Sequence, residues 1–143
     1  MFQIHSRLLH TTAAAAAVIA ALGAFHISSP AALAASPASI SGDWAGSGLF
    51  KLKSGNKERV RCRVKYGRIA GQDFSLNARC ATSGTNIDQT GKLTRVSKGR
   101  YVGNVHNEQF NVSAKIVVTV SGTHQDVSIS GNEGSAQIRL KRR

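Results

Sequence analysis

The clearest pattern in the chain is the alternation of apolar and polar positions across residues 57–82, a stretch that contains both cysteines. In its first half one parity is apolar and the other is cationic, which predicts a β-strand with one buried face and one basic face. A second alternating run follows a glycine-flanked break. Folding the two runs into an antiparallel hairpin centred on Gly71 places Cys62 opposite Cys80, with both side chains facing inward. We therefore predict a cross-strand disulfide inside a β-structure.

The rest of the chain repeats this alternation between short turns, and no window has helical periodicity. Besides the hairpin, the predicted strands cover residues 42–53, 86–96, 100–105, 110–120 and 124–130, with a last strand around Ala136, Ile138 and Leu140. Eight short strands joined by tight turns favour an all-β, eight-stranded antiparallel up-and-down barrel, because closure removes the two exposed edges. Inward glycines such as Gly46 and Gly48 either bend the strands or leave a cavity. We favour bending and a solid barrel.

The first 34 residues have the features of a secretory signal peptide: a weakly basic start at Arg7, an apolar run over residues 13–25 and a small-x-small site ending at Ala34. The apolar run is shorter than the ~20 residues that a membrane-spanning helix needs, so no transmembrane segment is predicted. We expect residues 1–34 to be the signal peptide, 35–41 a short linker and 42–143 a single barrel domain. The two cysteines fit an oxidising compartment, so the expected location is the bacterial periplasm or the cell exterior.

The chain is basic, with 19 Lys and Arg against 7 Asp and Glu, and the predicted mature chain keeps 18 of the basic residues for a balance of +11. Such a charge attracts anions over long range, but it also keeps a small exported protein soluble. Within the hairpin Arg63 faces Arg79, and like charges directly opposed on a sheet destabilise each other. A bound anion would relieve that repulsion. The predicted anion-binding residues are Arg59, Arg61, Arg63, Lys65 and Arg79.

The partner expected for this basic face is an anionic envelope polymer or a lipid surface, the alternative being an ordinary solvated wall. Nucleic acid is disfavoured, because no aromatic residues are interleaved with the cations to stack on bases. No catalytic motif is present: no serine lies in a G-x-S-x-G elbow, and the glycines of residues 42–48 are not followed by a helix. The clusters at His106 and His124 fall at opposite ends of a barrel, roughly 30 Å apart by strand length, and cannot share a metal. We predict a protein without enzymatic activity, cofactor or metal.

The tripeptide Gly42-Asp43-Trp44, combined with a basic residue on the last strand, resembles the calycins, which include lipocalins, avidins and small bacterial metallopeptidase inhibitors. The resemblance implies that Gly42 and Trp44 close the barrel floor and that a cation packs over the tryptophan, with Arg139 placed first and Lys141 or Arg142 as alternatives. The inhibitors also imply an N-terminal trunk, here residues 35–41, that enters a protease cleft. No segment matches the lipocalin helix, and a single Trp departs from the aromatic biotin site of avidins.

A wider pattern, WxGxG followed by CRVxY, CAT and a Gly/Ser-rich last strand, resembles small exported bacterial β-barrel proteins that are uncharacterised. This second resemblance implies a fold and a location but no activity. The predicted function is an exported, non-enzymatic binding module that contacts an anionic envelope component through its basic outer face. Two alternatives stay open: a calycin-like protease inhibitor that uses the trunk, and a carrier of a small apolar ligand in a cavity beneath Trp44.

Overall fold

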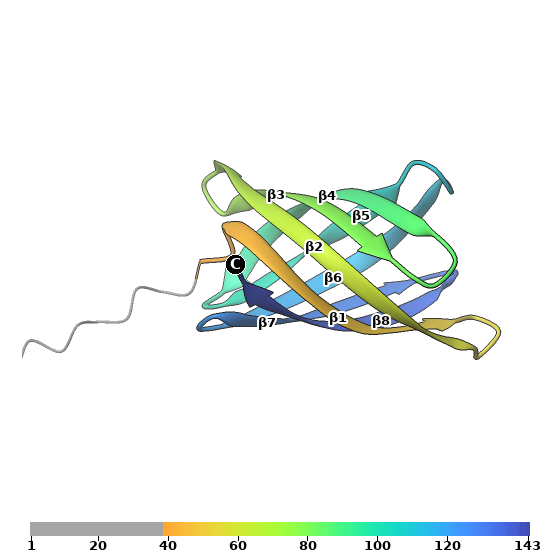
Figure 1. Cartoon of the computed structure of the whole chain (residues 1–143). Coiled ribbons are helices and arrows are strands. Elements are labelled where there is room, and N and C mark those ends of the chain that lie inside the picture. Colours follow the sequence, from red (N-terminus) through yellow and green to blue (C-terminus); the bar gives the residue numbers. More distant parts are fainter. Residues whose placement is uncertain (1–38) are drawn as a thin grey trace, which may run out of the picture. The chain divides into compact units, whose positions relative to one another are not determined.

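The computed structural model describes residues 39–143, which form a closed barrel of eight antiparallel strands (Figure 1). Each strand pairs with the next along the chain, and β1 pairs with β8 to close the barrel. The predicted fold class is therefore confirmed for these residues, whereas the predicted signal peptide and most of the linker lie outside them. The strands are β1 (Gly42–Leu52), β2 (Lys57–Ala70), β3 (Asp73–Ala81), β4 (Asn86–Ser97), β5 (Arg100–Asn107), β6 (Val112–Ser121), β7 (His124–Gly131) and β8 (Gly134–Arg142).

The β2–β3 hairpin has the predicted register. Cys62 pairs with Cys80 across the two strands, with their Cα atoms 4.1 Å apart, and the two side chains form a disulfide. The register follows from the alternation itself, because a slip by one residue would turn the apolar side chains outward and the arginines into the core. A bulge between Arg68 and Ala70 shifts the pairing just before the turn.

The two ends of the barrel differ. The β2–β3, β4–β5 and β6–β7 turns share one end with Arg143 and with residues 39–41, and we call this end the floor (Figure 1). The other four connections surround the opposite end, the mouth. Large buried side chains fill the floor half, and the Phe74 and Tyr101 rings pack edge to face there with centroids 5.3 Å apart. The largest fully buried side chains include Trp44, Tyr66, Tyr101, Ile40 and Leu93.

Two inward glycines show how the strands bend. A Cβ atom on Gly48 of β1 would lie 2.0 Å from the carbonyl oxygen of Gln137 in β8, and one on Gly103 of β5 would lie 1.9 Å from that of Lys92 in β4. Neighbouring backbones approach so closely at these positions that only glycine fits. The prediction that strand glycines allow bending agrees with this geometry.

The connection between β5 and β6 differs from the prediction. The strand expected over residues 110–120 begins at Val112, and Phe110 lies in a turn, with 53% of its surface exposed, instead of facing the core. Asn111 closes the turn with a φ of 51°, a conformation that asparagine tolerates better than most residues. The longest strand is β2, with 14 residues, because it continues through its bulge to the floor.

Candidate ligand cavity and basic outer wall

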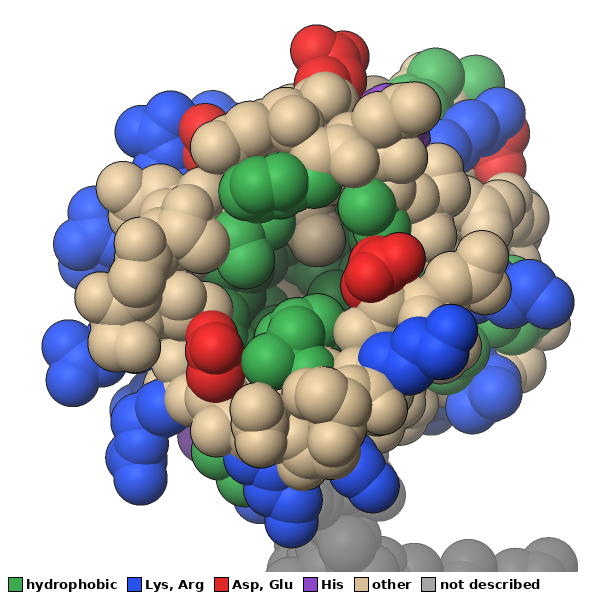
Figure 2. All heavy atoms as spheres, turned by 90° about the vertical axis from the view of Figure 1, so that its right-hand side faces the viewer, with side chains coloured by type: hydrophobic (Ala, Val, Ile, Leu, Met, Phe, Trp, Pro, Cys, Tyr) green, Lys and Arg blue, Asp and Glu red, His purple; other side chains and the backbone are tan. Residues whose placement is uncertain are grey.

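The mouth half of the barrel contains a cavity of about 570 Å³ that opens to solvent. Figure 2 looks into this end and shows a hollow surrounded by hydrophobic side chains, with acidic groups at its edge. Phe50, Val60, Ile87, Val112, Ile129 and Ile138 supply most of the apolar lining. The cavity lies at the end away from Trp44, so the predicted position beneath that residue is wrong.

The hollow results from the size of the inward side chains. Toward the mouth, β6, β7 and β8 present Ala114, Gly131, Gly134 and Ala136 to the interior. Toward the floor, the inward-facing residues of the same strands are larger: Ile116 and Leu140, for example, are buried there. An eight-stranded barrel is just wide enough for ordinary side chains to fill, so small ones leave space. The prediction of a solid barrel is therefore wrong for the mouth half, which is hollow, whereas large side chains fill the floor half.

One turn at the mouth is fixed by a buried polar side chain. The Asn107 amide donates to the carbonyl oxygen of Asp88 in β4 (2.6 Å), and its side-chain oxygen accepts from the backbone N–H of Phe110 (2.7 Å). These bonds hold the 108–111 turn against β4 and place Phe110 at the edge of the cavity. Sequence reasoning missed this role, although an asparagine at the start of a turn often bonds the backbone in this way.

The floor is closed by Trp44, of which 1% is exposed. Its indole Nε1 donates to the carbonyl oxygen of Ile40 (2.8 Å), and the guanidinium carbon of Arg142 lies 4.3 Å from the centre of its ring. Arg142 also donates to the backbone oxygens of Ser39 and Ser41. The last three residues of the predicted linker are therefore part of the floor.

The cation predicted first for this position was Arg139, and that assignment is wrong. Arg139 points to the outside of the barrel, where its Nε lies 2.7 Å from a carboxylate oxygen of Asp126. Arg142, one of the two alternatives, covers the tryptophan instead. Gly42 is at the floor as expected, with a φ of 112° that favours glycine, and the Arg142 side chain passes close to it.

A buried polar pair lies above the floor. The Tyr66 hydroxyl donates to the side-chain oxygen of Gln125 (3.2 Å), and both residues are almost fully buried. Burial raises the pKa of Tyr66 well above its usual range, because the phenolate would lose its hydration; the bond to Gln125 opposes this only in part. The Nε2 group of Gln125 has no hydrogen-bond partner within residues 39–143.

The predicted anion-binding residues divide into two groups. Arg79 pairs with Asp88, its neighbour on β4, through Nε at 2.7 Å, and this contact holds the pKa of Asp88 below its usual range. Asp88 of the same sheet therefore counters the charge of Arg79, so the opposition of Arg63 and Arg79 does not by itself indicate a bound anion. The other four residues are exposed and form no ion pair in the described part of the chain. We call these four the basic wall: Arg59, Arg61, Arg63 and Lys65.

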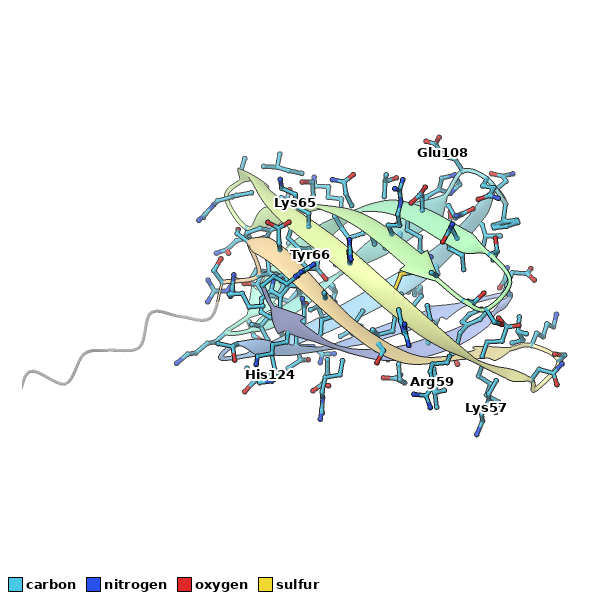
Figure 3. The ribbon with its side chains drawn as sticks, in the orientation of Figure 1. Lys57, Arg59, Lys65, Tyr66, Glu108 and His124 are labelled. Atoms are coloured by element: carbon cyan, nitrogen blue, oxygen red, sulfur yellow. A yellow bond between two sulfur atoms is a disulfide. The ribbon has the colours of Figure 1, made fainter. Side chains whose placement is uncertain are left out.

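The closure of the barrel extends the basic wall. The register places Ala45 of β1 between Arg63 of β2 and Lys141 of β8, and Ser47 between Arg61 and Arg139. Lys141 therefore adds a cation to the wall, across Ala45 from Arg63 and about 10 Å away given the spacing of neighbouring strands, whereas Arg139 is already paired with Asp126. Figure 3 shows Lys57, Arg59 and Lys65 along β2. The position of Lys141 beside the wall could not be predicted without knowing that β1 and β8 pair.

The histidine clusters lie where the strand count placed them. Glu108 belongs to the mouth turn and His124 begins β7 at the floor, at opposite ends of the barrel in Figure 3. His106 contacts the Ser113 hydroxyl through Nδ1 (2.9 Å). Among residues 39–143, no group of three or more His, Cys, Asp or Glu side chains is arranged to hold a metal ion. The same part of the chain has no helix long and apolar enough to cross a membrane.

Comparison with known proteins places the fold among eight-stranded barrels. No protein-family model matches the chain, and no curated protein sequence matches it. The redesigned β-barrel mFAP1, solved with DFHBI bound, is 16% identical, with a TM-score of 0.61 over 73% of this chain and 94% of its own. A fluorescence-activating β-barrel designed de novo is 14% identical, with a TM-score of 0.58 over 73% of this chain and 94% of its own. At these identities the similarity establishes the barrel fold alone.

Proposed function

We propose that this protein is a non-enzymatic binding module whose barrel takes up a small, largely apolar ligand through its mouth. The observation that carries the proposal is the open cavity of about 570 Å³ between apolar walls. Ligand sites in proteins commonly have volumes of about 300–1,000 Å³ and mostly hydrophobic linings. An apolar ligand would displace poorly held water from such walls, which is favourable by roughly 25 cal/mol for each Å² buried.

Two further observations support the proposal. The mFAP1 barrel was solved with the small molecule DFHBI bound, so a barrel of this general fold can hold one. The floor is closed by Trp44 and Arg142, so the floor half keeps a filled core beside the hollow mouth half. The disulfide between Cys62 and Cys80 is compatible with an exported protein.

Filling the cavity should weaken ligand binding. We expect the neutral apolar dye N-phenyl-1-naphthylamine to bind saturably to the folded protein, and Ala136→Phe to weaken that binding at least tenfold, because Ala136 faces the cavity from β8. Dye fluorescence titration measures both. Ser130→Phe is the matched control, since it adds the same ring to an exposed position on the neighbouring strand. If the phenyl ring of Ala136→Phe prevents folding, Ala114→Leu takes its place in the test, because it fills the cavity from β6.

The absence of saturable dye binding to the unmodified protein would contradict the proposal. Equal weakening by Ala136→Phe and Ser130→Phe would contradict it too, because the dye would then bind outside the cavity. Circular dichroism of each variant establishes that the barrel is folded before binding is compared.

A second candidate function is contact with an anionic envelope polymer or lipid surface through the basic wall. The observation that favours it is that four neighbouring cations on β2 have no carboxylate partner in residues 39–143, while Lys141 adds charge from β8. The sheet therefore presents a continuous positive strip that internal ion pairs do not neutralise. The protease-inhibitor alternative has less support, because Ile40 is fully buried and a deletion of residues 35–41 would also remove part of the floor.

Charge reversal in the basic wall should weaken binding to dextran sulfate more than the same change elsewhere. For Arg61→Glu with Arg63→Glu we expect the slope of log affinity against log salt to fall by about two, since each lost cation–anion contact removes close to one. Lys98→Glu with Arg100→Glu gives the same net charge at exposed positions outside the wall. Equal slopes for the two double variants would show that net charge, and not the wall, governs the attraction.

A further inference from the structure

The cavity lining has a charge opposite to that of the protein. Basic residues outnumber acidic ones by 19 to 7 in the chain. The titratable side chains that line the cavity are nevertheless two carboxylates, Glu58 and Glu133, and no Lys, Arg or His lines it. Neither carboxylate forms an ion pair within residues 39–143. Figure 2 shows acidic groups at the edge of the hollow, with a basic side chain beside one of them.

The fold places these carboxylates at the mouth from different directions. Glu58 lies on the inward parity of β2, two residues before Val60, whereas Lys57 and Arg59 lie on the outward parity and are exposed. Glu133 belongs to the β7–β8 turn, whose backbone accepts a hydrogen bond from the N–H of Lys53 beside β1. Glu108 lies in a third mouth turn, outside the lining. Two carboxylates thus stand where the apolar interior meets solvent, while Lys53 and Lys57, at the same end of the barrel, lie outside the lining.

We propose that the cavity selects amphiphiles with an apolar body and a cationic head group, such as an alkylammonium. This inference rests on the proposed ligand-binding function and specifies the chemical class of the ligand. The apolar body occupies the space between Phe50, Ile87, Val112 and Ile138, and the head lies at the mouth near Glu58 and Glu133. Such a charge pair is stronger at the partly desolvated edge of a cavity than in bulk water, because the effective dielectric is lower there.

The same carboxylates act against anionic amphiphiles. A carboxylate head group at the mouth would meet like charges with no cation in the lining to compensate, so a fatty acid would be rejected although the protein as a whole is positive. Specificity of this kind arises from an unfavourable contact with the wrong ligand as much as from a favourable contact with the right one. The remaining polar groups of the lining, including Thr82 and Gln89, are neutral and do not distinguish the two.

The test compares three probes with the same twelve-carbon chain at pH 7, below their micelle concentrations. Dodecylamine, dodecanol and dodecanoate each compete against bound N-phenyl-1-naphthylamine. We expect the unmodified protein to bind dodecylamine at least tenfold more tightly than dodecanoate, a difference of about 1.4 kcal/mol, with dodecanol between them. In the double variant Glu58→Gln with Glu133→Gln, the affinities for dodecylamine and dodecanoate should agree within about threefold.

A matched control separates the mouth carboxylates from net charge. Glu108→Gln with Asp43→Asn removes the same two negative charges from exposed residues outside the lining, and should keep the tenfold preference. Saturable dye binding without a preference for dodecylamine would overturn this inference and leave the ligand-binding function intact. A preference that survives in the Glu58/Glu133 variant would overturn the role of these carboxylates. Absence of dye binding would overturn the proposed function and this inference together.

Discussion

Replacement of Trp44 by alanine is expected to lower the free energy of unfolding by about 3–5 kcal/mol, the usual cost of removing a large buried aromatic side chain. The residue is 1% exposed and lies under the Arg142 guanidinium. Its indole N–H bonds the Ile40 carbonyl, so the substitution removes packing, a buried hydrogen bond and the surface on which Arg142 rests. The start of β1 and the end of β8 would lose a common contact.

The measurement is equilibrium urea unfolding followed by far-UV circular dichroism, since Trp44 is the only tryptophan and its fluorescence is lost in the variant. Trp44→Phe is the control that keeps an aromatic ring but removes the N–H donor, and it should cost less than the alanine change. A loss below about 1 kcal/mol for Trp44→Ala would contradict the floor described above, because it would mean that the side chain is not part of the cooperative core.

The floor also shows what the sequence could have predicted. On β8 the buried residues recur with a period of two at Ala136, Ile138 and Leu140, and Arg142 continues that parity. Arg139 lies on the other parity and therefore points outward. The resemblance to calycins indicated that a cation covers the tryptophan but not which one. The alternation of the strand itself contained that information.

Features that depend on pairing between distant strands could not be predicted. The position of Lys141 beside the basic wall requires β1 to meet β8, at the two ends of the described chain. The Arg79–Asp88 pair is different: β3 and β4 are consecutive strands, so this local pair was accessible from the sequence, although it was not predicted. The hairpin register, in contrast, follows from local alternation and a short turn. Local pairs were thus accessible to sequence reasoning, whereas pairs that depend on closure were not.

For a different reason, the sequence left a cavity open only as an alternative and favoured a solid barrel. Counting small inward residues does not distinguish bends from voids, because the outcome depends on what lies across the barrel. At Gly48 and Gly103 the backbone of a neighbouring strand occupies the space that a side chain would take. Ala114 and Ala136 face open space at the mouth. Position along the barrel axis, which requires the closed structure, separates the two groups.

Removal of the disulfide is expected to lower the free energy of unfolding by about 3 kcal/mol. Cys62 and Cys80 are 18 residues apart in sequence, and a crosslink over a loop of this size restricts the unfolded chain by roughly that amount. The native barrel should persist after the loss, because β2 and β3 remain paired through their backbones. At roughly 4–8 °C for each kcal/mol, the thermal midpoint should fall by about 12–24 °C.

Unfolding of the unmodified protein with and without a reductant measures this effect directly, and Cys62→Ala with Cys80→Ala separates the crosslink from the reductant itself. The double variant should unfold near the reduced protein and should not respond to reductant. Because the crosslink joins two strands of one hairpin, its contribution depends on how far that hairpin opens when the barrel unfolds. A decrease below about 1 kcal/mol would contradict the prediction, since it would require the reduced, unfolded chain to keep the β2–β3 pairing that the disulfide otherwise enforces.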